Sequence, residues 1–508
     1  MRYLYTLAIL GCVLFWSSCR NDFETVPSTG NLEFSKDTVY LDTIFTSIGS
    51  STYNLKVYNR SDEDINIPTV RLAQGESSNY RLNVDGVPGK VFENVQILAK
   101  DSIFIFIETT FNINNLPQNP KEFLYTDQLL FDSGGNEQKV ELVTLVKDAV
   151  FLFPEKYADG TYETLTLGSG DDAVEVKGFF LDDTELTFTN EKPYVIYGYA
   201  AVPGNKTLNV QPGARVHFHD GSGIIVANEG SIQAVGGYSM DREALENEII
   251  FEGDRLEPGF SDVPGQWLTV WMTQGSTNNR FEYVTIKNST VGLLVDNSPV
   301  YLSNVQIYNS TNVGILARNS AIVGENMVVN NSGQSSLAVQ LGGNYEFRHC
   351  TFANYWNNGF RSFPTVSLDN SFETETEILV NDLVKADFIN CIVYGNERRE
   401  FSLNKVDMGE FNFKFENSLL LFEDPTGEFS ENPLYDFTNA VFYPNTVLNI
   451  DPAFQDTENN NFNIESGTSG ADGIGKPGVA PTEDLNGQTR DANNPDAGAY
   501  ESTVFPEE

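Results

Sequence analysis

The sequence predicts an all-β chain in which an immunoglobulin-like β-sandwich precedes a parallel β-helix. The main observation is an apolar register in the middle of the chain. Its members are 21, 22 and 23 residues apart: Val284, Val305, Met327 and Cys350. Alternating apolar and polar residues around these positions predict strands with one buried face, and a period in the low twenties predicts stacked coils. Each coil would bury its inward side chains against the coils on either side, so the core would be one continuous column.

The same register continues four residues further on, where each coil carries an asparagine. Stacked Asn288, Asn309 and Asn331 are expected to form an amide ladder that fixes one corner of the coil. A second strand series runs beside the first and predicts another side of the coil. Its members are the segments 291–298, 313–320 and 365–371.

The first series then jumps 41 residues, from Cys350 to Cys391. We expect residues 373–385 to be an insertion in this interval, because 365–371 belongs to the second strand series. Cys350 and Cys391 would then stack at one inward position of adjacent coils, about 4.8 Å apart. Such a distance allows a disulfide, but stacked inward thiols are also good hydrophobes. The pattern favours reduced cysteines and leaves the disulfide open.

The N-terminal third shows short alternating strands separated by turns. Tyr53, Leu55 and Val57 alternate with polar residues, as do Ile103, Ile105 and Ile107. About seven such strands indicate an Ig-like β-sandwich, without the cysteine pair of antibody domains. The predicted order is a signal peptide, a tether, the sandwich, connecting strands, the β-helix and an end segment: 1–18, 19–30, 31–150, 151–205, 206–450 and 451–508.

The composition is strongly acidic, with 71 Asp and Glu against 31 Lys and Arg, and a formal net charge of −40. Binding to phosphates requires clustered cations. The charge therefore argues against nucleic acid and anionic lipid surfaces as partners. It also argues against acidic polysaccharides unless a cation mediates the contact.

The first residues have the pattern of a bacterial lipoprotein signal. Arg2 precedes an apolar run that ends at Trp16, too short to span the hydrocarbon core comfortably, and small residues then lead to Cys19. The resemblance implies that Cys19 becomes the lipidated N-terminus. Asp22 and Glu24 resemble the surface-export signal of Bacteroidota lipoproteins, which implies an outer-membrane protein, anchored by lipid and facing the cell surface.

The C-terminal part carries the most specific resemblance. Residues 450–456 (IDPAFQD), 461–475 (NFNIESGTSGADGIG) and 484–501 (DLNGQTRDANNPDAGAYE) resemble the terminal segment of right-handed β-helix proteins of the pectate-lyase-like superfamily. The opening coils, 205–236, together with the segments 248–255 and 263–270, resemble the β-helix region of Bacteroidota envelope lipoproteins. The resemblance implies a right-handed helix over about 200–505. It does not imply one activity, because the superfamily includes lyases, hydrolases, epimerases, adhesins and scaffolds.

The ionisable residues do not form a recognisable catalytic or metal-binding motif. His217, His219 and His349 do not stand near a carboxylate cluster in the sequence, although a β-helix lyase needs a base and usually a carboxylate-bound cation. Asp171-Asp172 and Asp182-Asp183 are read as turns, because the motifs that flank a hydrolase aspartate pair are missing. We therefore assign no catalytic residue, metal site or cofactor. A lyase or glycoside hydrolase with a scattered site remains the alternative.

An interaction surface is predicted instead. Insertions into one side of a solenoid often carry its binding site. Tyr355, Trp356, Phe360 and Arg361 cluster in such an insertion, where exposed aromatic residues and an arginine would suit a sugar ring or a protein partner. The alternative is that these side chains pack on the flank of the helix. The sequence thus favours a non-catalytic envelope lipoprotein, whose β-helix is a binding or scaffold surface and which could be an accessory subunit of an outer-membrane complex.

Overall fold

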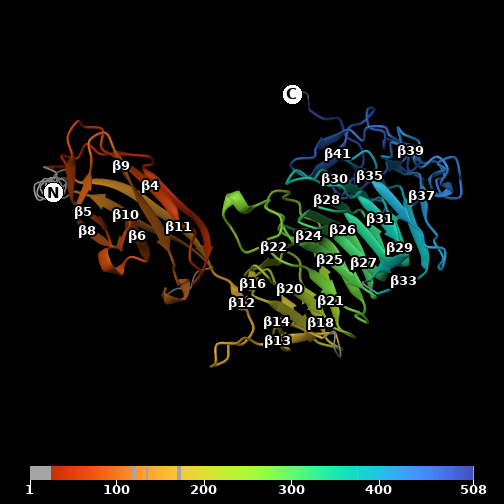
Figure 1. Cartoon of the computed structure of the whole chain (residues 1–508), viewed down its shortest axis with the longest axis horizontal. Coiled ribbons are helices and arrows are strands. Elements are labelled where there is room, and N and C mark those ends of the chain that lie inside the picture. Colours follow the sequence, from red (N-terminus) through yellow and green to blue (C-terminus); the bar gives the residue numbers. More distant parts are fainter. Residues whose placement is uncertain (1–24, 117–120, 133–135, 169–172, 375, 507–508) are drawn as a thin grey trace, which may run out of the picture. The chain divides into compact units, whose positions relative to one another are not determined.

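The computed structural model describes residues 25–116, 121–132, 136–168, 173–374 and 376–506. In these ranges the chain is all-β, with short 3-10 turns between strands. It divides into two compact units between Asp148 and Ala149, coloured red to orange and orange to blue in Figure 1. The predicted all-β class is confirmed. Cys19 lies outside the described residues.

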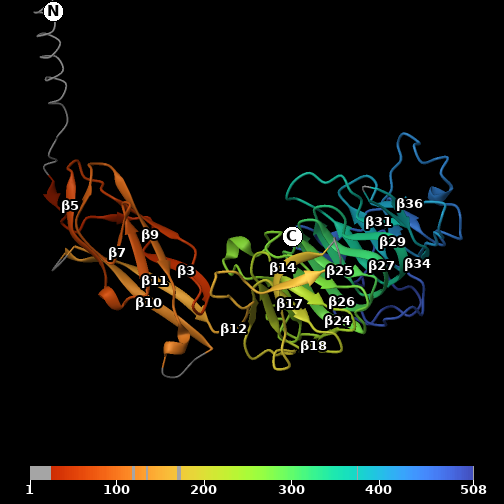
Figure 2. The ribbon, with the colours of Figure 1, turned by 60° about the horizontal axis from the view of Figure 1, so that its bottom comes forward.

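The N-terminal unit contains two sheets (Figure 2). One has the order β1-β5-β10-β11-β3, with β8 also paired to β5. Its strands are β1 (Val26–Pro27), β3 (Thr38–Phe45), β5 (Ile65–Leu72), β8 (Val91–Ile97), β10 (Glu122–Phe131) and β11 (Gln138–Lys147). The other has the order β2-β4-β9-β6-β7. Its strands are β2 (Glu33–Phe34), β4 (Tyr53–Tyr58), β6 (Tyr80–Val84), β7 (Val87–Gly89) and β9 (Ser102–Thr109).

The core of this unit follows from side-chain alternation along the strands. Ile103, Ile105 and Ile107 of β9 are buried, while Phe104 and Phe106 between them are exposed. The buried set forms one cluster with side chains of the other sheet. Both predicted alternating segments are therefore strands. Two short 3-10 turns, η1 (Gly75–Ser77) and η2 (Ile113–Asn115), complete the unit.

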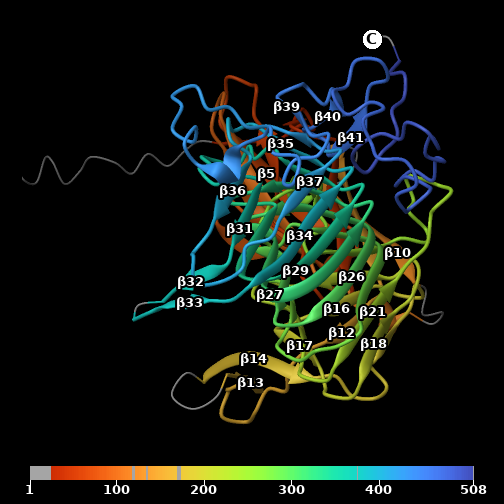
Figure 3. The same cartoon turned by 90° about the vertical axis from the view of Figure 1, so that its right-hand side faces the viewer.

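The second unit is dominated by parallel strand pairing in three ladders (Figures 1 and 3). Ladder A contains β12 (Val150–Leu152), β16 (Tyr194–Ile196), β19 (Arg215–Phe218), β22 (Ile249–Gly253), the end of β24 (Asn279–Lys287), the end of β26 (Pro299–Ser310), β28 (Val328–Ser332), β30 (Thr351–Asn354), β35 (Ile392–Gly395), β38 (Leu419–Leu420) and β39 (Val447–Leu448).

Ladder B contains β14 (Val174–Phe180), β17 (Tyr199–Val202), β20 (Gly223–Val226), β23 (Val270–Met272), β25 (Val291–Asp296), the starts of β27 (Val313–Glu325) and β29 (Leu337–Arg348), β31 (Val366–Asp369) and β36 (Phe401–Asn404). Ladder C contains β15 (Thr187–Phe188), β18 (Thr207–Val210), β21 (Ser231–Val235), the starts of β24 and β26, the ends of β27 and β29, β34 (Leu383–Ile389) and β37 (Lys414–Glu416).

The three ladders begin before the predicted boundary at residue 206. β12 already pairs with β16, and β14 already pairs with β17. The segment 151–205, expected as a connection, therefore supplies the first rungs. One antiparallel partner, β13 (Thr164–Leu167), lies against β14. Further turns are η5 (Pro258–Phe260) and η6 (Pro433–Tyr435), and a separate pair is β40 (Phe454–Asp456) with β41 (Asn461–Ile464).

The sequence register corresponds to ladder A. Val284 pairs with Val305, and the following pairings place Met327, Cys350 and Cys391 in the same inward row. All five are buried in one core cluster that extends through the ladders. Cys350 and Cys391 are free thiols, as the sequence favoured.

The corner asparagines behave as predicted. The Asn309 amide donates to Asn288 Oδ1 at 3.1 Å, and the Asn331 amide donates to Asn309 Oδ1 at 2.7 Å. Their φ angles are 65°, 58° and 54°, in the left-handed region that asparagine tolerates better than most residues. Asparagine therefore serves both the backbone of the corner and the contact between coils.

Two details of the second strand series differ from the prediction. The start of β29, at Leu337, stands between the segments 313–320 and 365–371 and was missed. The predicted insertion 373–385 is in part a hairpin of β32 (Ser371–Glu373) and β33 (Ile378–Val380), which projects to the side in Figure 3. Its last residues belong to ladder C, because β34 begins at the fully buried Leu383.

Candidate functional site

The predicted contact insertion, residues 355–363, holds Arg361 in the interior rather than at the surface. The side chains of Arg361 and Glu400 are 1% and 0% exposed, and two guanidinium nitrogens reach the carboxylate at 2.7 and 2.9 Å. The same guanidinium donates to the Asn354 and Phe363 carbonyls. The expectation of an exposed Arg361 is wrong, because Glu400, 39 residues later, lies directly beneath the insertion.

The aromatic residues of the insertion divide between packing and exposure. Tyr355 is half-buried against Phe454 and Phe462, with ring centroids 6.2 Å apart in both pairs. The Trp356 carbonyl accepts a hydrogen bond from Asn396, and its side chain is partly buried. Phe360 is 91% exposed. Of the four predicted contact residues, Phe360 thus presents the largest free side chain.

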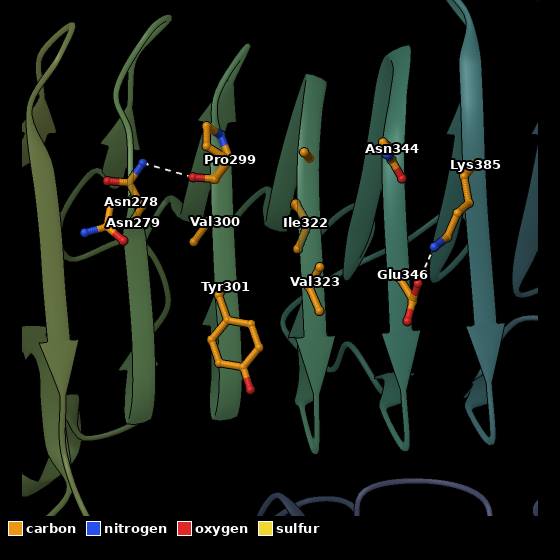
Figure 4. A pocket seen from close by; sticks show the side chains of 11 residues that line it. Asn278, Asn279, Pro299, Val300, Tyr301, Ile322, Val323, Asn344, Glu346 and Lys385 are labelled. Carbon is orange, nitrogen blue, oxygen red and sulfur yellow. Dashed lines mark hydrogen bonds and ion pairs between the residues drawn. The ribbon is translucent and has the colours of Figure 1, made fainter. Parts of the chain in front are cut away.

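A groove on the outer face of ladder C combines polar and apolar side chains. It has a volume of 420 Å³ and crosses five strands, β24, β26, β27, β29 and β34. Figure 4 shows Asn278 at one end, Lys385 at the other, and Tyr301 between them on the strand next to Asn278. The lining residues are Asn278, Asn279, Pro299, Val300, Tyr301, Ala321, Ile322, Val323, Asn344, Glu346 and Lys385.

The parallel register brings these residues together. Tyr301 pairs with Val323, and Val323 pairs with Glu346, so the three form one row across the strands. Asn344 pairs with Lys385 in the neighbouring row. These side chains face outward because the residues that alternate with them, such as Tyr345 and Phe347, are buried in the core.

The charged groups of the groove neutralise one another. The Glu346 carboxylate accepts from Lys385 and, at 2.6 Å, from Arg348 Nε; the hydrogen bond from Lys385 lowers the pKa of Glu346, against the effect of its partial burial. Arg348 also pairs with Glu325 at 2.5 Å. The Tyr301 hydroxyl donates a hydrogen bond to Glu325 Oε2 at 2.7 Å. Partial burial and this hydrogen bond raise the pKa of Tyr301.

This arrangement suits binding better than proton transfer. Lys385 and Arg348 hold Glu346 as a carboxylate with a lowered pKa, so it is not prepared to donate a proton near neutral pH. The Arg280 guanidinium lies over the Tyr301 ring, 4.7 Å from its centroid, so the ring adds an apolar surface with a cation beside it to the hydrogen-bonding groups of the groove. The sequence analysis missed Tyr301, Glu346 and Lys385. The first two could have been found by extending the same period, since Tyr301, Val323 and Glu346 are 22 and 23 residues apart.

The histidines lie at three different sites. His219 Nδ1 is 2.8 Å from Asp254 Oδ2, and that hydrogen bond raises the pKa of His219. His217 Nδ1 is 3.6 Å from a Glu252 carboxylate oxygen. Both carboxylates are 35 residues later in sequence, and the pairing of β19 with β22 brings them close. The sequence shows no carboxylate cluster beside these histidines, and the fold brings one carboxylate to each of them from a distant segment.

His349 is buried in the C-terminal half of the second unit. Burial and the positive charge of Arg490 lower its pKa to about 3. Its Nε2 is 3.0 Å from the Asn390 amide nitrogen. This neutral histidine belongs to the packing of the coils.

The predicted aspartate turns are only partly described. Asp182 accepts from the Thr184 backbone N–H at 2.7 Å and closes a turn, whereas Asp171 and Asp172 lie outside the described residues. Over the described ranges, no group of three or more His, Cys, Asp and Glu side chains is placed to hold a metal ion. The same ranges contain no helix with the length and hydropathy of a membrane span.

No protein-family model and no curated protein sequence matches the chain. Similar solved structures include a family 123 glycoside hydrolase from Clostridium perfringens, 8% identical over 24% of this chain and 30% of that one. They also include the PapD-like domain 7 of human CEP192, 12% identical over 26% and 94%, and the E. coli chaperone DraB, 14% identical over 25% and 58%. Each TM-score is 0.16, so these likenesses carry no argument about function.

Proposed function

We propose that the chain is a lipid-anchored, non-catalytic outer-membrane lipoprotein whose groove on ladder C binds an extended glycan. In this proposal the first unit is an Ig-like β-sandwich that acts as a spacer. The second is a right-handed parallel β-helix of the pectate-lyase-like kind. The two sheets around one core support the first assignment. The three parallel ladders around a continuous core support the second.

The observation that carries the binding proposal is the self-neutralised groove. Its five strands are spaced by about 4.8 Å, so it extends roughly 19 Å across the ladder, long enough for several units of a polymer. Tyr301 supplies a ring face, and Asn278, Asn344, Glu346 and Lys385 supply hydrogen-bonding groups. Aromatic faces with a few fixed polar groups are typical of sites that bind sugars by stacking and hydrogen bonding.

The test is binding of the full chain to a panel of neutral and acidic polysaccharides. We expect at least one to bind, and Tyr301→Ala with Lys385→Met to weaken that binding about tenfold or more. Tyr40→Ala is the matched control, since Tyr40 is a 65% exposed tyrosine of the other unit. The glycan proposal would be overturned if none of the polysaccharides bound, or if the groove variants bound them as tightly as the wild-type protein.

The alternative is a polysaccharide lyase or glycoside hydrolase. The same polysaccharides are incubated with wild-type protein, and unsaturated products and new reducing ends are measured. Turnover that disappears in the groove variants but not in Tyr40→Ala would replace the non-catalytic proposal with the enzymatic one.

The lipid anchor is tested by Cys19→Ala. The thiol is the acceptor of the lipid in this proposal, and the apolar segment before it is too short to hold the protein in a membrane. We expect the variant to move from the membrane fraction to the soluble fraction and to lose incorporation of labelled palmitate. A variant that still sediments with membranes would contradict the anchor at Cys19.

A further inference from the structure

A second cavity, independent of the groove, lies where β36 meets two loops. Its volume is 590 Å³. Its lining includes Ser362, at the end of the 355–363 insertion, and Pro364 just after it. It also includes Phe429 and Tyr435 from the segment after β38. The remaining lining residues are Asn396, Glu397, Arg398, Arg399, Phe401, Ser402, Asn404 and Phe422. We call this cavity the arginine pocket.

The base of the arginine pocket is aromatic. Phe422 lies 4.9 Å from Tyr435 and 5.4 Å from Phe429, measured between ring centroids. Phe401 lies 5.1 Å from Phe422. Phe401, Phe422 and Tyr435 are buried, whereas Phe429 keeps part of its surface free. A flat ligand entering the pocket can therefore contact the ring of Phe429.

The two arginines that line the pocket differ in their partners. Arg399 pairs with Glu428 at 2.9 Å and stacks 4.8 Å from the Phe429 centroid. Arg398 is exposed. Among the arginines of the described ranges, its side chain alone makes no hydrogen bond, ion pair or ring contact. The chain has 71 acidic and 31 basic residues, yet this arginine at the wall of a cavity has no intramolecular carboxylate as a partner. Its guanidinium is therefore available to pair with the anion of a ligand.

The part of the lining formed by Ser362 and Pro364 is rigidly held. The buried Arg361 guanidinium donates to the Phe363 carbonyl at 2.7 Å, and Glu400 accepts from the Thr365 N–H at 3.0 Å and from its hydroxyl at 2.6 Å. Residues on both sides of Ser362 and Pro364 are thus fixed by one ion pair. A preformed wall reduces the entropy lost when a ligand binds.

We propose that the arginine pocket binds an oxyanion carried on a six-membered ring, with Arg398 pairing the anion and Phe429 contacting the ring. Apart from the Glu397 carboxylate, the lining contains two guanidinium groups and the Ser362 hydroxyl as donors for such an anion. The Ser402 hydroxyl already donates to Ser367, and the Asn396 amide already donates to the Trp356 carbonyl. Guanidinium groups bind carboxylate, sulfate and phosphate oxygens through paired hydrogen bonds. The ring could belong to an acidic sugar or to an aromatic acid.

The test uses titration calorimetry of the full chain at low salt with four probes: phenyl sulfate, methyl glucuronide, inorganic sulfate and neutral methyl glucoside. We expect saturable binding of at least one ring oxyanion at one site per chain, tighter than inorganic sulfate, with methyl glucoside not bound. Preference for phenyl sulfate would identify an aromatic acid as the source, and preference for methyl glucuronide would identify an acidic sugar.

Variants then assign the binding to the pocket. Arg398→Gln should weaken the ring oxyanion about tenfold or more, and Arg398→Lys should weaken it less because the charge is kept. Phe429→Leu should reduce affinity toward that of inorganic sulfate. Arg60→Gln, an exposed arginine of the first unit, and Lys385→Met in the groove should leave it unchanged. This last control separates the pocket from the proposed glycan groove.

Three results would overturn the proposal. The first is no saturation by either ring oxyanion up to about 10 mM. The second is binding that Arg398→Gln does not change while thermal unfolding shows the variant folded. The third is inorganic sulfate binding as tightly as the ring oxyanions, which would indicate an adventitious ion only.

Discussion

At the scale of single residues, the ion pair of Arg361 and Glu400 shows how burial changes the role of a residue. Both side chains are almost fully buried, and the carboxylate also accepts from Thr365 and from the Glu397 N–H. Removing one partner of a buried pair leaves an uncompensated charge, whereas removing both leaves none. This pair therefore joins the insertion to Glu400, the residue before β36, and the fold depends on both partners being present.

We predict that Arg361→Ala lowers the free energy of unfolding by about 3–5 kcal/mol. Phe360→Ala, at the 91% exposed neighbour, should change it by no more than about 0.5 kcal/mol. Urea unfolding followed by fluorescence measures both, and Arg361→Met with Glu400→Leu should recover part of the loss. A small effect of Arg361→Ala would show that solvent reaches the carboxylate in solution.

His349 occupies an asparagine position. Asn304, Asn326 and Asn390 have φ angles of 55°, 50° and 55°, and His349 has 51°. The Asn326 amide donates to Asn304 at 3.1 Å, and Asn390 contacts His349 at 3.0 Å. This second column of left-handed corner residues was not recognised in the sequence. Asparagine at 349 should therefore fit both the backbone and the contact between coils.

The buried His349 predicts acid-dependent stability. Burial, with Arg490, lowers its folded pKa to about 3, below the ordinary 6.5, so between these values the unfolded chain binds one more proton. Stability from this group is present above pH 6.5 and decreases as the pH falls toward 3, by roughly 1.4 kcal/mol per pH unit.

The measurement is urea unfolding at several pH values between 6 and 4 for wild type and His349→Asn. Both proteins share every carboxylate, so the difference between their stabilities isolates the histidine. We expect that difference to change by roughly 1.4 kcal/mol per pH unit in favour of His349→Asn as the pH falls. Parallel profiles would mean that His349 is protonated in the folded protein.

At the scale of elements, strand periodicity could be read from the sequence, but contacts between distant segments could not. The spacing from Val284 to Cys350 gave the inward row of ladder A, because identical coils repeat the same burial. The start of β29 was missed although Leu337 and Val339 alternate there; Gly342 and Gly343, which have positive φ angles, follow it before the strand continues into ladder C. Arg361 was misplaced because its partner, Glu400, lies beyond the hairpin in sequence.

Shortening the β32–β33 hairpin tests where the predicted insertion, residues 373–385, ends. Phe372 pairs with Leu379, so a two-residue turn can join them. We predict that replacing residues 373–378 by Asn-Gly leaves the unfolding midpoint nearly unchanged. Leu383→Ala should lower stability by about 2–5 kcal/mol, because Leu383 is fully buried at the start of β34.

Both hairpin variants are compared by thermal unfolding followed by circular dichroism. A large loss of stability on shortening the hairpin would show that it supports the coils. A negligible effect of Leu383→Ala would place the end of the insertion within β34, as the sequence suggested with its boundary at residue 385.

At the scale of the whole molecule, the two units have separate cores. Ile105 is fully buried in the cluster of the first unit, and Phe347 is fully buried in the cluster of the second. The boundary between the two units, between Asp148 and Ala149, lies just before β12, the first strand of ladder A. A core that is complete within its own segment can unfold as its own cooperative unit.

We therefore predict two calorimetric transitions for the full chain, each sensitive to its own core. Ile105→Ala should move one transition to lower temperature, through a loss of about 2–5 kcal/mol, and leave the other in place. Phe347→Ala should do the reverse, through a loss of about 3–5 kcal/mol. A fragment ending at Asp148 should reproduce the transition that Ile105→Ala shifts. A single transition that both substitutions displace would contradict this expectation. It would mean that neither core unfolds without the other, so that the two units form one cooperative structure.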